Sequence, residues 1–194
     1  MTLSTYYIKD CVEAGVDEAG RGCLAGPVVA SAVILPNNFP FDILDDSKKM
    51  TVRKREEARK IIEVESLAWG VAFVDNHKID EINILQASIL AMHKAISNLS
   101  TMPELLLIDG NRFNKYQSIE HRTIVKGDAK LCSIAAASIL AKTHRDEYMD
   151  KIAREYPLYQ WEQNKGYPTI KHRKFIEEHG VTPFHRLSFR LTKA

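Results

Sequence analysis

Cysteine is scarce in this sequence, which has three residues of this type and no pair spaced as Cys-x-x-Cys: Cys11, Cys23 and Cys132. An odd, widely spaced set argues against both a disulfide framework and a structural zinc site. Buried free thiols are the simplest interpretation.

Long apolar runs are also missing. The longest, such as residues 28–35, are interrupted by serine or bounded by proline, well short of the roughly 18 apolar residues that a membrane-spanning helix needs. The N-terminus has no basic patch followed by an apolar core and a cleavage site, so it does not resemble a secretory signal. These absences predict a protein that spans no membrane and stays in the cytoplasm.

The overall composition is that of an ordinary globular protein. Its 194 residues are 45% hydrophobic and 27% charged, which fits a single domain. The net charge of +2 hides an uneven distribution: residues 142–194 carry 11 Lys and Arg against 7 Asp and Glu, whereas residues 1–141 carry 16 against 18. An acidic-leaning body joined to a basic C-terminal segment suits an enzyme that uses metal ions on nucleic acid.

Apolar periodicity predicts the order of the elements. Strands are expected at residues 13–16, 28–35, 67–74, 104–109 and 122–125, and helices at residues 49–64, 80–99, 133–148 and 170–178. Strands in hairpin order followed by alternating helices and strands favour one α/β domain. It would contain a mixed sheet flanked by helices, with residues 142–194 as a C-terminal helical extension.

Four acids stand at the ends of apolar strands or after glycine turns, where open α/β sheets tend to bind ligands: Asp17, Glu18, Asp109 and Asp128. Alone, Asp128 could be the N-cap of a helix beginning at Ala129, and Asp109 could belong to a turn. Asp17 and Glu18 repel each other, which favours a bound cation or a raised pKa. An oxygen-only set suits Mg²⁺ or Mn²⁺, and hence two-metal phosphoryl transfer.

The sequence from Gly20 to Ala25 also fits G-x-G-x-x-A, a relaxed dinucleotide-binding pattern. That pattern requires a helix directly after the glycines, whereas residues 28–35 read as a strand. The two acids before the turn would also repel a pyrophosphate. We therefore reject a dinucleotide site and interpret the glycines as allowing close approach of the backbone to a ligand.

The run from Gly15 to Val28, which reads Gly-Val-Asp-Glu-Ala-Gly-Arg-Gly-Cys-Leu-Ala-Gly-Pro-Val, closely resembles the signature of type 2 ribonucleases H, the ribonuclease HII family. Further blocks resemble the family in the same order along nearly the whole chain. These blocks are Asp46-Ser47-Lys48-Lys49, Leu107-Ile108-Asp109-Gly110, Lys126-Gly127-Asp128 with the helix from Ser133 to Ser138, Gly166-Tyr167-Pro168-Thr169, and His185-Arg186-Leu187-Ser188-Phe189.

The resemblance implies an RNase H-like fold, with a mixed five-stranded sheet and a C-terminal helical region that helps to hold a duplex. It implies that Asp17, Glu18, Asp109 and Asp128 are the metal-binding catalytic carboxylates. The reaction would be hydrolysis on the 5′ side of a ribonucleotide, in an RNA–DNA hybrid or in duplex DNA with one ribonucleotide, leaving 5′-phosphate and 3′-hydroxyl ends. Such an enzyme removes misincorporated ribonucleotides from DNA.

The resemblance also implies substrate contacts. Gly20, Arg21 and Gly22 match the loop that reads the ribose 2′-hydroxyl, the group that distinguishes RNA from DNA. Tyr167 matches a tyrosine that packs on the sugar of the nucleotide after the cleaved bond; without the family match, a tyrosine that anchors a loop would be favoured. Pro168 leaves the exact pose of that tyrosine open.

Four basic residues carry weaker expectations. Lys48 and Lys49 resemble lysines that contact phosphates, although a solvated helix start would explain at least one of them. For His185 and Arg186, ordinary solvated side chains are the expectation.

Two alternatives remain at this point. One is a type 3 ribonuclease H, which prefers longer ribonucleotide runs. Such enzymes usually carry a further domain before the catalytic one, whereas 16 residues precede Asp17 here, which disfavours this alternative. The other is a nucleic-acid-binding module without catalysis, in which the acids are caps and turns. A monomer is the simplest expectation, because the active face must admit a duplex.

Overall fold

The computed structural model describes residues 3–45 and 50–192. At its centre lies a five-stranded sheet of order β3-β2-β1-β4-β5. The strands are β1 (Glu13–Ala19), β2 (Val28–Ile34), β3 (Ala68–Val74), β4 (Leu105–Asp109) and β5 (Glu120–Ile124). β1, β2 and β3 are antiparallel neighbours, whereas β1, β4 and β5 run parallel. The predicted mixed sheet is confirmed.

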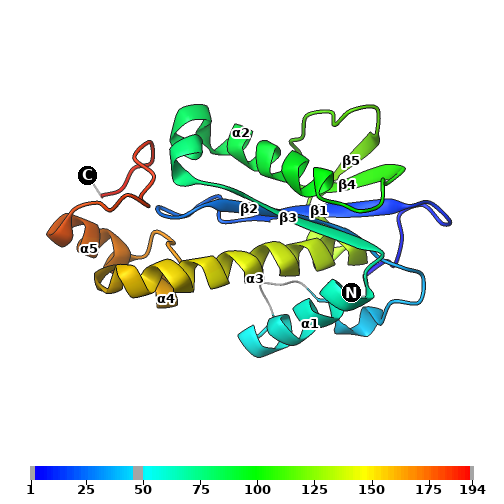
Figure 1. Cartoon of the computed structure of the whole chain (residues 1–194), viewed down its shortest axis with the longest axis horizontal. Coiled ribbons are helices and arrows are strands. Elements are labelled where there is room, and N and C mark those ends of the chain that lie inside the picture. Colours follow the sequence, from blue (N-terminus) through cyan, green and yellow to red (C-terminus); the bar gives the residue numbers. More distant parts are fainter. Residues whose placement is uncertain (1–2, 46–49, 193–194) are drawn as a thin grey trace.

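Helices cover both faces of this sheet. The helices of the described residues are α1 (Val52–Glu65), α2 (Asn76–Ser97), α3 (Cys132–Glu155), α4 (Trp161–Asn164) and α5 (Ile170–His179), with 3₁₀ turns η1 (Phe41–Ile43), η2 (Gly127–Ala129) and η3 (Pro157–Tyr159). α2 lies on one face and α3, with α1 beyond it, on the other (Figure 1). Within the described residues, no helix is both long and apolar enough to cross a membrane.

Two apolar clusters hold these layers together. Between the sheet and α2, Val16 and Ile108 pack with Met92; on the other face, Val33 packs with Ile62 of α1 and Leu140 of α3. Burying these side chains is the main favourable term in folding. β1 lies at the centre of the sheet and is buried on both faces, so any polar side chain on it is removed from water.

The β1–α3 contact is unusually close because Gly15 has no side chain. A Cβ at this position would lie 2.1 Å from the carbonyl carbon of Ser133 and 2.3 Å from the backbone nitrogen of Ile134. The start of α3 therefore rests directly on the backbone of β1. This contact fixes the position of α3 relative to the acids farther along the strand.

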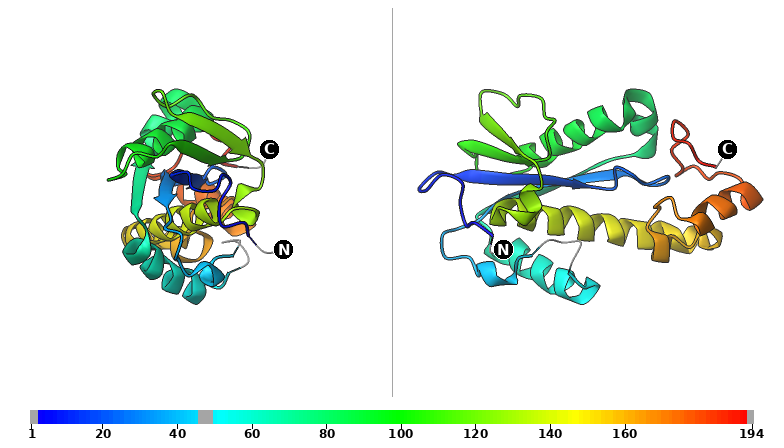
Figure 2. Two further views of the ribbon diagram at one scale, coloured as in Figure 1. Left: turned by 90° about the vertical axis from the view of Figure 1, so that its right-hand side faces the viewer. Right: turned by 180° about the vertical axis from the view of Figure 1, so that it is seen from behind.

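The C-terminal elements pack around the second half of α3. Trp161 is fully buried beside Met149, Ile152 and Phe184. Figure 2 shows α5 and the C-terminal loop beyond one end of the sheet, next to the turn between β1 and β2. The extension expected for residues 142–194 therefore begins inside α3, which continues from the sheet into this segment.

The structure differs from the sequence predictions at several boundaries. Asp17 and Glu18 lie within β1 and not in a turn after it, because pairing with β2 continues as far as Ala19 and Val29. α2 begins four residues earlier than expected, since the Asp75 carboxylate accepts a hydrogen bond from the Lys78 N–H at 2.8 Å and caps the helix.

Candidate active site

Asp17 and Asp109 come together because β1 and β4 are parallel neighbours. The register pairs Val16 with Ile108, so the acid that follows each residue occupies the adjacent position. Asp17 is only 4% exposed, and its carboxylate accepts a hydrogen bond from the side chain of Ser138 on α3. Burial, and then the charges of Glu18 and Asp109, raise the pKa of Asp17 well above its ordinary value.

Glu18 is the second acid of this cluster of carboxylates. Burial raises its pKa to about 7, while Arg21, whose Nη1 lies 3.3 Å from Glu18 Oε1, opposes the rise and Asp109 adds to it. Its other carboxylate oxygen, Oε2, is buried without a hydrogen-bond partner among the described residues. A buried acceptor without a donor is costly, and a cation would satisfy it.

Asp128 reaches the same region through a tight turn. Its neighbour Gly127 donates its N–H to Asp109 Oδ1 at 2.6 Å, and a Cβ on Gly127 would lie 2.6 Å from Ile134. Asp128 is 4% exposed and lies in η2, whereas α3 starts at Cys132. The alternative in which Asp128 caps a helix beginning at Ala129 is therefore wrong.

The four acids do not form a finished metal site. Across residues 3–45 and 50–192, no three His, Cys, Asp or Glu side chains are grouped closely enough to ligate one ion. Asp17, Glu18 and Asp109 are within electrostatic range of one another, and Asp128 adjoins Asp109 through Gly127. The oxygen-only donors and the unpartnered Glu18 oxygen nevertheless suit a hard divalent cation.

The segment between β1 and β2, residues 20–27, is called the glycine turn below, and it packs against Arg145 of α3. Gly20 has φ +96°, and a Cβ there would lie 2.1 Å from Arg145 Nε, so both conformation and space require glycine. The guanidinium of Arg145 is fully buried and donates to the carbonyl oxygens of Ala25, Pro27 and Lys165 at 2.8–3.1 Å. The buried guanidinium of Arg145 thus stabilises the backbone of the turn on the side that faces α3. The residues after the turn form strand β2, as predicted, so the helix that a dinucleotide-binding pattern requires is missing at this place.

Arg186 supports the same turn from the C-terminal segment, which corrects the expectation that it and His185 are solvated. Both side chains are buried. Arg186 donates from Nε to the Gly26 carbonyl at 2.9 Å and from Nη1 to the Arg21 carbonyl at 3.1 Å. Burial lowers the pKa of its guanidinium to about 10. These bonds to backbone oxygens take the place of water at two of its nitrogens, whereas Nη2 is buried without a hydrogen-bond partner among the described residues.

Tyr167 is held against this turn. The Leu24 N–H donates to the Gly166 carbonyl at 2.7 Å, and the Tyr167 side chain is hydrogen-bonded to Cys23. The Tyr167 residue is 39% exposed, so part of its ring faces solvent. The tyrosine and the glycine turn, which are about 145 residues apart in the sequence, therefore form one surface.

A buried histidine pair fixes the backbone of Tyr167. His172 Nδ1 lies 2.9 Å from the Tyr167 carbonyl oxygen, and Trp161 Nε1 donates to His172 Nε2 at 3.0 Å. His185 Nε2 is 3.3 Å from the same His172 nitrogen. Burial lowers the pKa of His172, and burial together with His172 lowers the pKa of His185 to about 4, so both rings are neutral at pH 7.

Lys48 and Lys49, the expected phosphate contacts, lie outside the described residues. The sequence interpretation missed Arg145. A signal for it was present, because Ser138, Lys142 and Arg145 recur at four- and three-residue spacing and so share one face of α3. On that face, Ser138 contacts the carboxylate half of the site at Asp17, and Arg145 contacts the other half, the glycine turn, at Gly20.

A family model described as Ribonuclease HII matches residues 14–192. The ribonuclease HII of Bacteroides thetaiotaomicron is 60% identical over 189 residues, which cover 97% of this chain and 94% of that protein.

Solved structures agree with the fold. Ribonuclease H2 from Pyrococcus horikoshii OT3 matches with a TM-score of 0.78 at 25% identity, over 92% of this chain and 94% of that one. Bst-RNase HIII in complex with Mn²⁺ matches with a TM-score of 0.71 at 18% identity, over 93% of this chain and 67% of that one, a likeness of fold alone.

Proposed function

Because the chain belongs to the ribonuclease HII family, a family of ribonuclease H endonucleases, we propose that it hydrolyses the RNA strand of RNA–DNA hybrids and incises duplex DNA on the 5′ side of a single ribonucleotide. The observation that carries this proposal is the continuity of the site. Buried carboxylates, a glycine turn and Tyr167 are joined by hydrogen bonds through α3 and the C-terminal segment. Removal of misincorporated ribonucleotides from DNA would follow from this activity.

Asp17, Glu18, Asp109 and Asp128 would hold the divalent cations, Mg²⁺ or Mn²⁺. Support comes from the mutual repulsion of the first three and from the unpartnered oxygen of Glu18. The complex of Bst-RNase HIII with Mn²⁺ shows that a protein of this fold binds such an ion. When bound, two cations would activate the attacking water and stabilise the leaving oxygen. Ser138 would keep Asp17 oriented toward them.

The turn at Gly20, Arg21 and Gly22 would read the ribose 2′-hydroxyl. Arg186 and Arg145 hold carbonyl oxygens of the turn on its inner side, which gives it a fixed shape before substrate arrives. A Cβ on Gly22 would meet nothing within 4 Å, so the space above this residue is open to a ligand. Such a surface suits recognition of a sugar hydroxyl by the backbone.

Tyr167 would pack on the sugar of the nucleotide after the cleaved bond. A ring that is partly exposed, with its backbone fixed by His172, offers a rigid apolar surface at little cost in conformational entropy. Lys48 and Lys49 would contact phosphates of the same duplex.

Gly22→Ala tests the proposed recognition of the ribose. We expect the melting temperature to stay within about 2 °C of wild type, because the added methyl group has room. Cleavage of a DNA duplex with one ribonucleotide should fall by about a hundredfold, because the methyl group occupies the space needed by the sugar. Initial rates on duplexes with one, four or no ribonucleotides measure this effect.

The same three substrates separate the alternatives. A wild-type enzyme that cuts the duplex with four ribonucleotides but not the one with a single ribonucleotide would have type 3 specificity. Salt-sensitive binding to all three without metal-dependent cleavage would indicate a binding module. Unchanged cleavage by Gly22→Ala would show that the turn does not approach the ribose.

A further inference from the structure

Lys142 lies on the face of α3 that joins the two halves of the site. Ser138, one helical turn before it, contacts Asp17, and Arg145, about one turn after it, lies against Gly20. The Lys142 ammonium is 5.7 Å from the centroid of the Tyr167 ring. It therefore lies beside the tyrosine, on the helix face that also carries Ser138 and Arg145.

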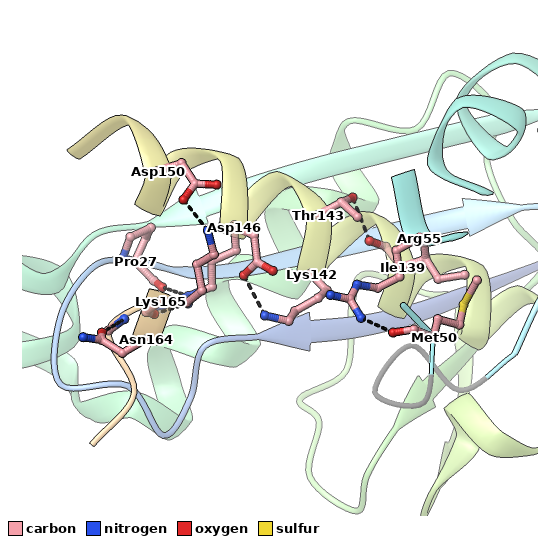
Figure 3. A network of polar contacts seen from close by, with 12 residues as sticks. Pro27, Met50, Arg55, Ile139, Lys142, Thr143, Asp146, Asp150, Asn164 and Lys165 are labelled. Atoms are coloured by element: carbon pink, nitrogen blue, oxygen red, sulfur yellow. Dashed lines mark hydrogen bonds and ion pairs between the residues drawn. The ribbon is translucent and has the colours of Figure 1, made fainter. Parts of the chain in front are cut away.

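An aspartate on the same helix holds the Lys142 ammonium in place. Lys142 Nζ donates to Asp146 Oδ1 at 2.6 Å, and the lysine side chain is 22% exposed. Figure 3 shows this pair on α3 and, farther along the helix, Asp150 paired with Lys165, which comes from the segment after α4. An ammonium has three donors, so the bond to Asp146 leaves two for an oxyanion.

This ammonium is also accessible from solvent. Lys142 and Lys165 line a groove of about 1110 Å³ that runs along α3 beside α1 and α4. Substrate phosphate at the edge of this groove could reach the lysine without any rearrangement of the core. The tether to Asp146 reduces the conformational entropy that the side chain loses when it binds.

We infer that Lys142 binds the backbone phosphate on the 3′ side of the nucleotide whose sugar packs on Tyr167. This inference rests on the proposed function. A sugar in a nucleic-acid strand has a phosphate on each side. The phosphate at the cleaved bond would lie at the carboxylates, so the other phosphate extends past the sugar, on the side of the tyrosine where the lysine stands.

The experiment compares two nicked duplexes, each with one ribonucleotide placed directly before the nick. In one, the downstream strand begins with a 5′-phosphate; in the other, it begins with a 5′-hydroxyl, so that the single phosphate in question is missing. Wild type should lose about tenfold in kcat/KM when this phosphate is removed, as expected for a hydrogen bond to a charged group. Lys142→Gln should lose about tenfold on the phosphorylated duplex and nothing further on the other.

Three controls sharpen the result. Lys94→Gln, an exposed position on α2 across the sheet, should behave as wild type on both duplexes. Lys142→Arg should recover part of the lost rate, which a purely structural role would not require. Moving the nick one nucleotide downstream should remove the difference between wild type and Lys142→Gln in their response to the phosphate.

Equal losses for wild type and Lys142→Gln on removal of the phosphate would overturn the inference, because the two changes would then be independent. Failure of the proposed function would look different. In that case wild type would leave an intact duplex with one ribonucleotide uncut in both Mg²⁺ and Mn²⁺.

Discussion

Replacing Asp17 by asparagine is expected to abolish cleavage while making the protein more stable. Cleavage of a duplex with one ribonucleotide should fall by about three orders of magnitude, the range seen when a group that stabilises transition-state charge is removed. The gain in stability has a separate origin. Asp17 is buried beside Glu18 and Asp109, and without a bound cation these carboxylates repel one another. Replacing Asp17 by a neutral residue removes this repulsion.

The pH dependence follows from the sign of the pKa shift. A carboxyl whose pKa is raised in the folded state binds its proton more tightly there than in the unfolded chain. Stability therefore falls as the pH rises from the ordinary value near 4 through the folded value, which for Glu18 is about 7. Because the pKa of Asp17 is also raised, its penalty grows as the pH rises above the ordinary value, so the gain from Asp17→Asn should be larger at pH 8 than at pH 5.

Thermal denaturation at pH 8 without divalent cations measures this gain. We expect about 2 kcal/mol and a rise in melting temperature of about 5 °C for Asp17→Asn. Mg²⁺ should raise the melting temperature of wild type more than that of the variant. Asp10→Asn, at an exposed position, serves as the control and should change neither activity nor stability. A variant that is less stable than wild type would show that favourable contacts hold the carboxylate.

Gly15→Ala is expected to have the largest effect on folding. The new methyl group would lie 2.1 Å from the backbone of Ser133, and a backbone atom at the start of α3 cannot move away as a flexible side chain would. The helix must shift, which costs about 3 kcal/mol or more, as in other overpacked cores. The shift would also separate Ser138 from Asp17, so cleavage should fall with stability.

Thermal denaturation and the cleavage rate measure the two consequences of Gly15→Ala. Gly22→Ala is the matched control for stability, since the same methyl group meets nothing within 4 Å there. We expect the melting temperature of Gly15→Ala to fall by about 10 °C and that of Gly22→Ala to stay near wild type. Equal melting temperatures for the two variants would contradict the close contact between β1 and α3.

Much of the fold could be predicted from periodicity. The apolar runs gave the order of strands and helices, because burial decides both the sheet and the helix faces. Boundaries were less predictable. β1 continues through Asp17 and Glu18 against the low strand propensity of acids, since its pairing with β2 outweighs that preference.

The site was predictable to a different extent in its two halves. The four carboxylates could be selected by their places at or near strand ends, a rule of sheet topology, and their role as metal ligands stays a prediction. Arg145 and Arg186 could not be found from composition, because arginine is almost always exposed unless it is paired. Here both are buried on backbone carbonyl oxygens, and those partners are distant in the sequence. Only the folded chain brings them together.

One measurement tests the central claim most directly: incubation of wild type with a DNA duplex that contains a single ribonucleotide, in Mg²⁺, in Mn²⁺ and in EDTA, with the products mapped to the base. The proposed function predicts one incision on the 5′ side of the ribonucleotide, with a 3′-hydroxyl and a 5′-phosphate, in either metal and none in EDTA. Equal cutting of an all-DNA duplex, or incision that persists in EDTA, would contradict it.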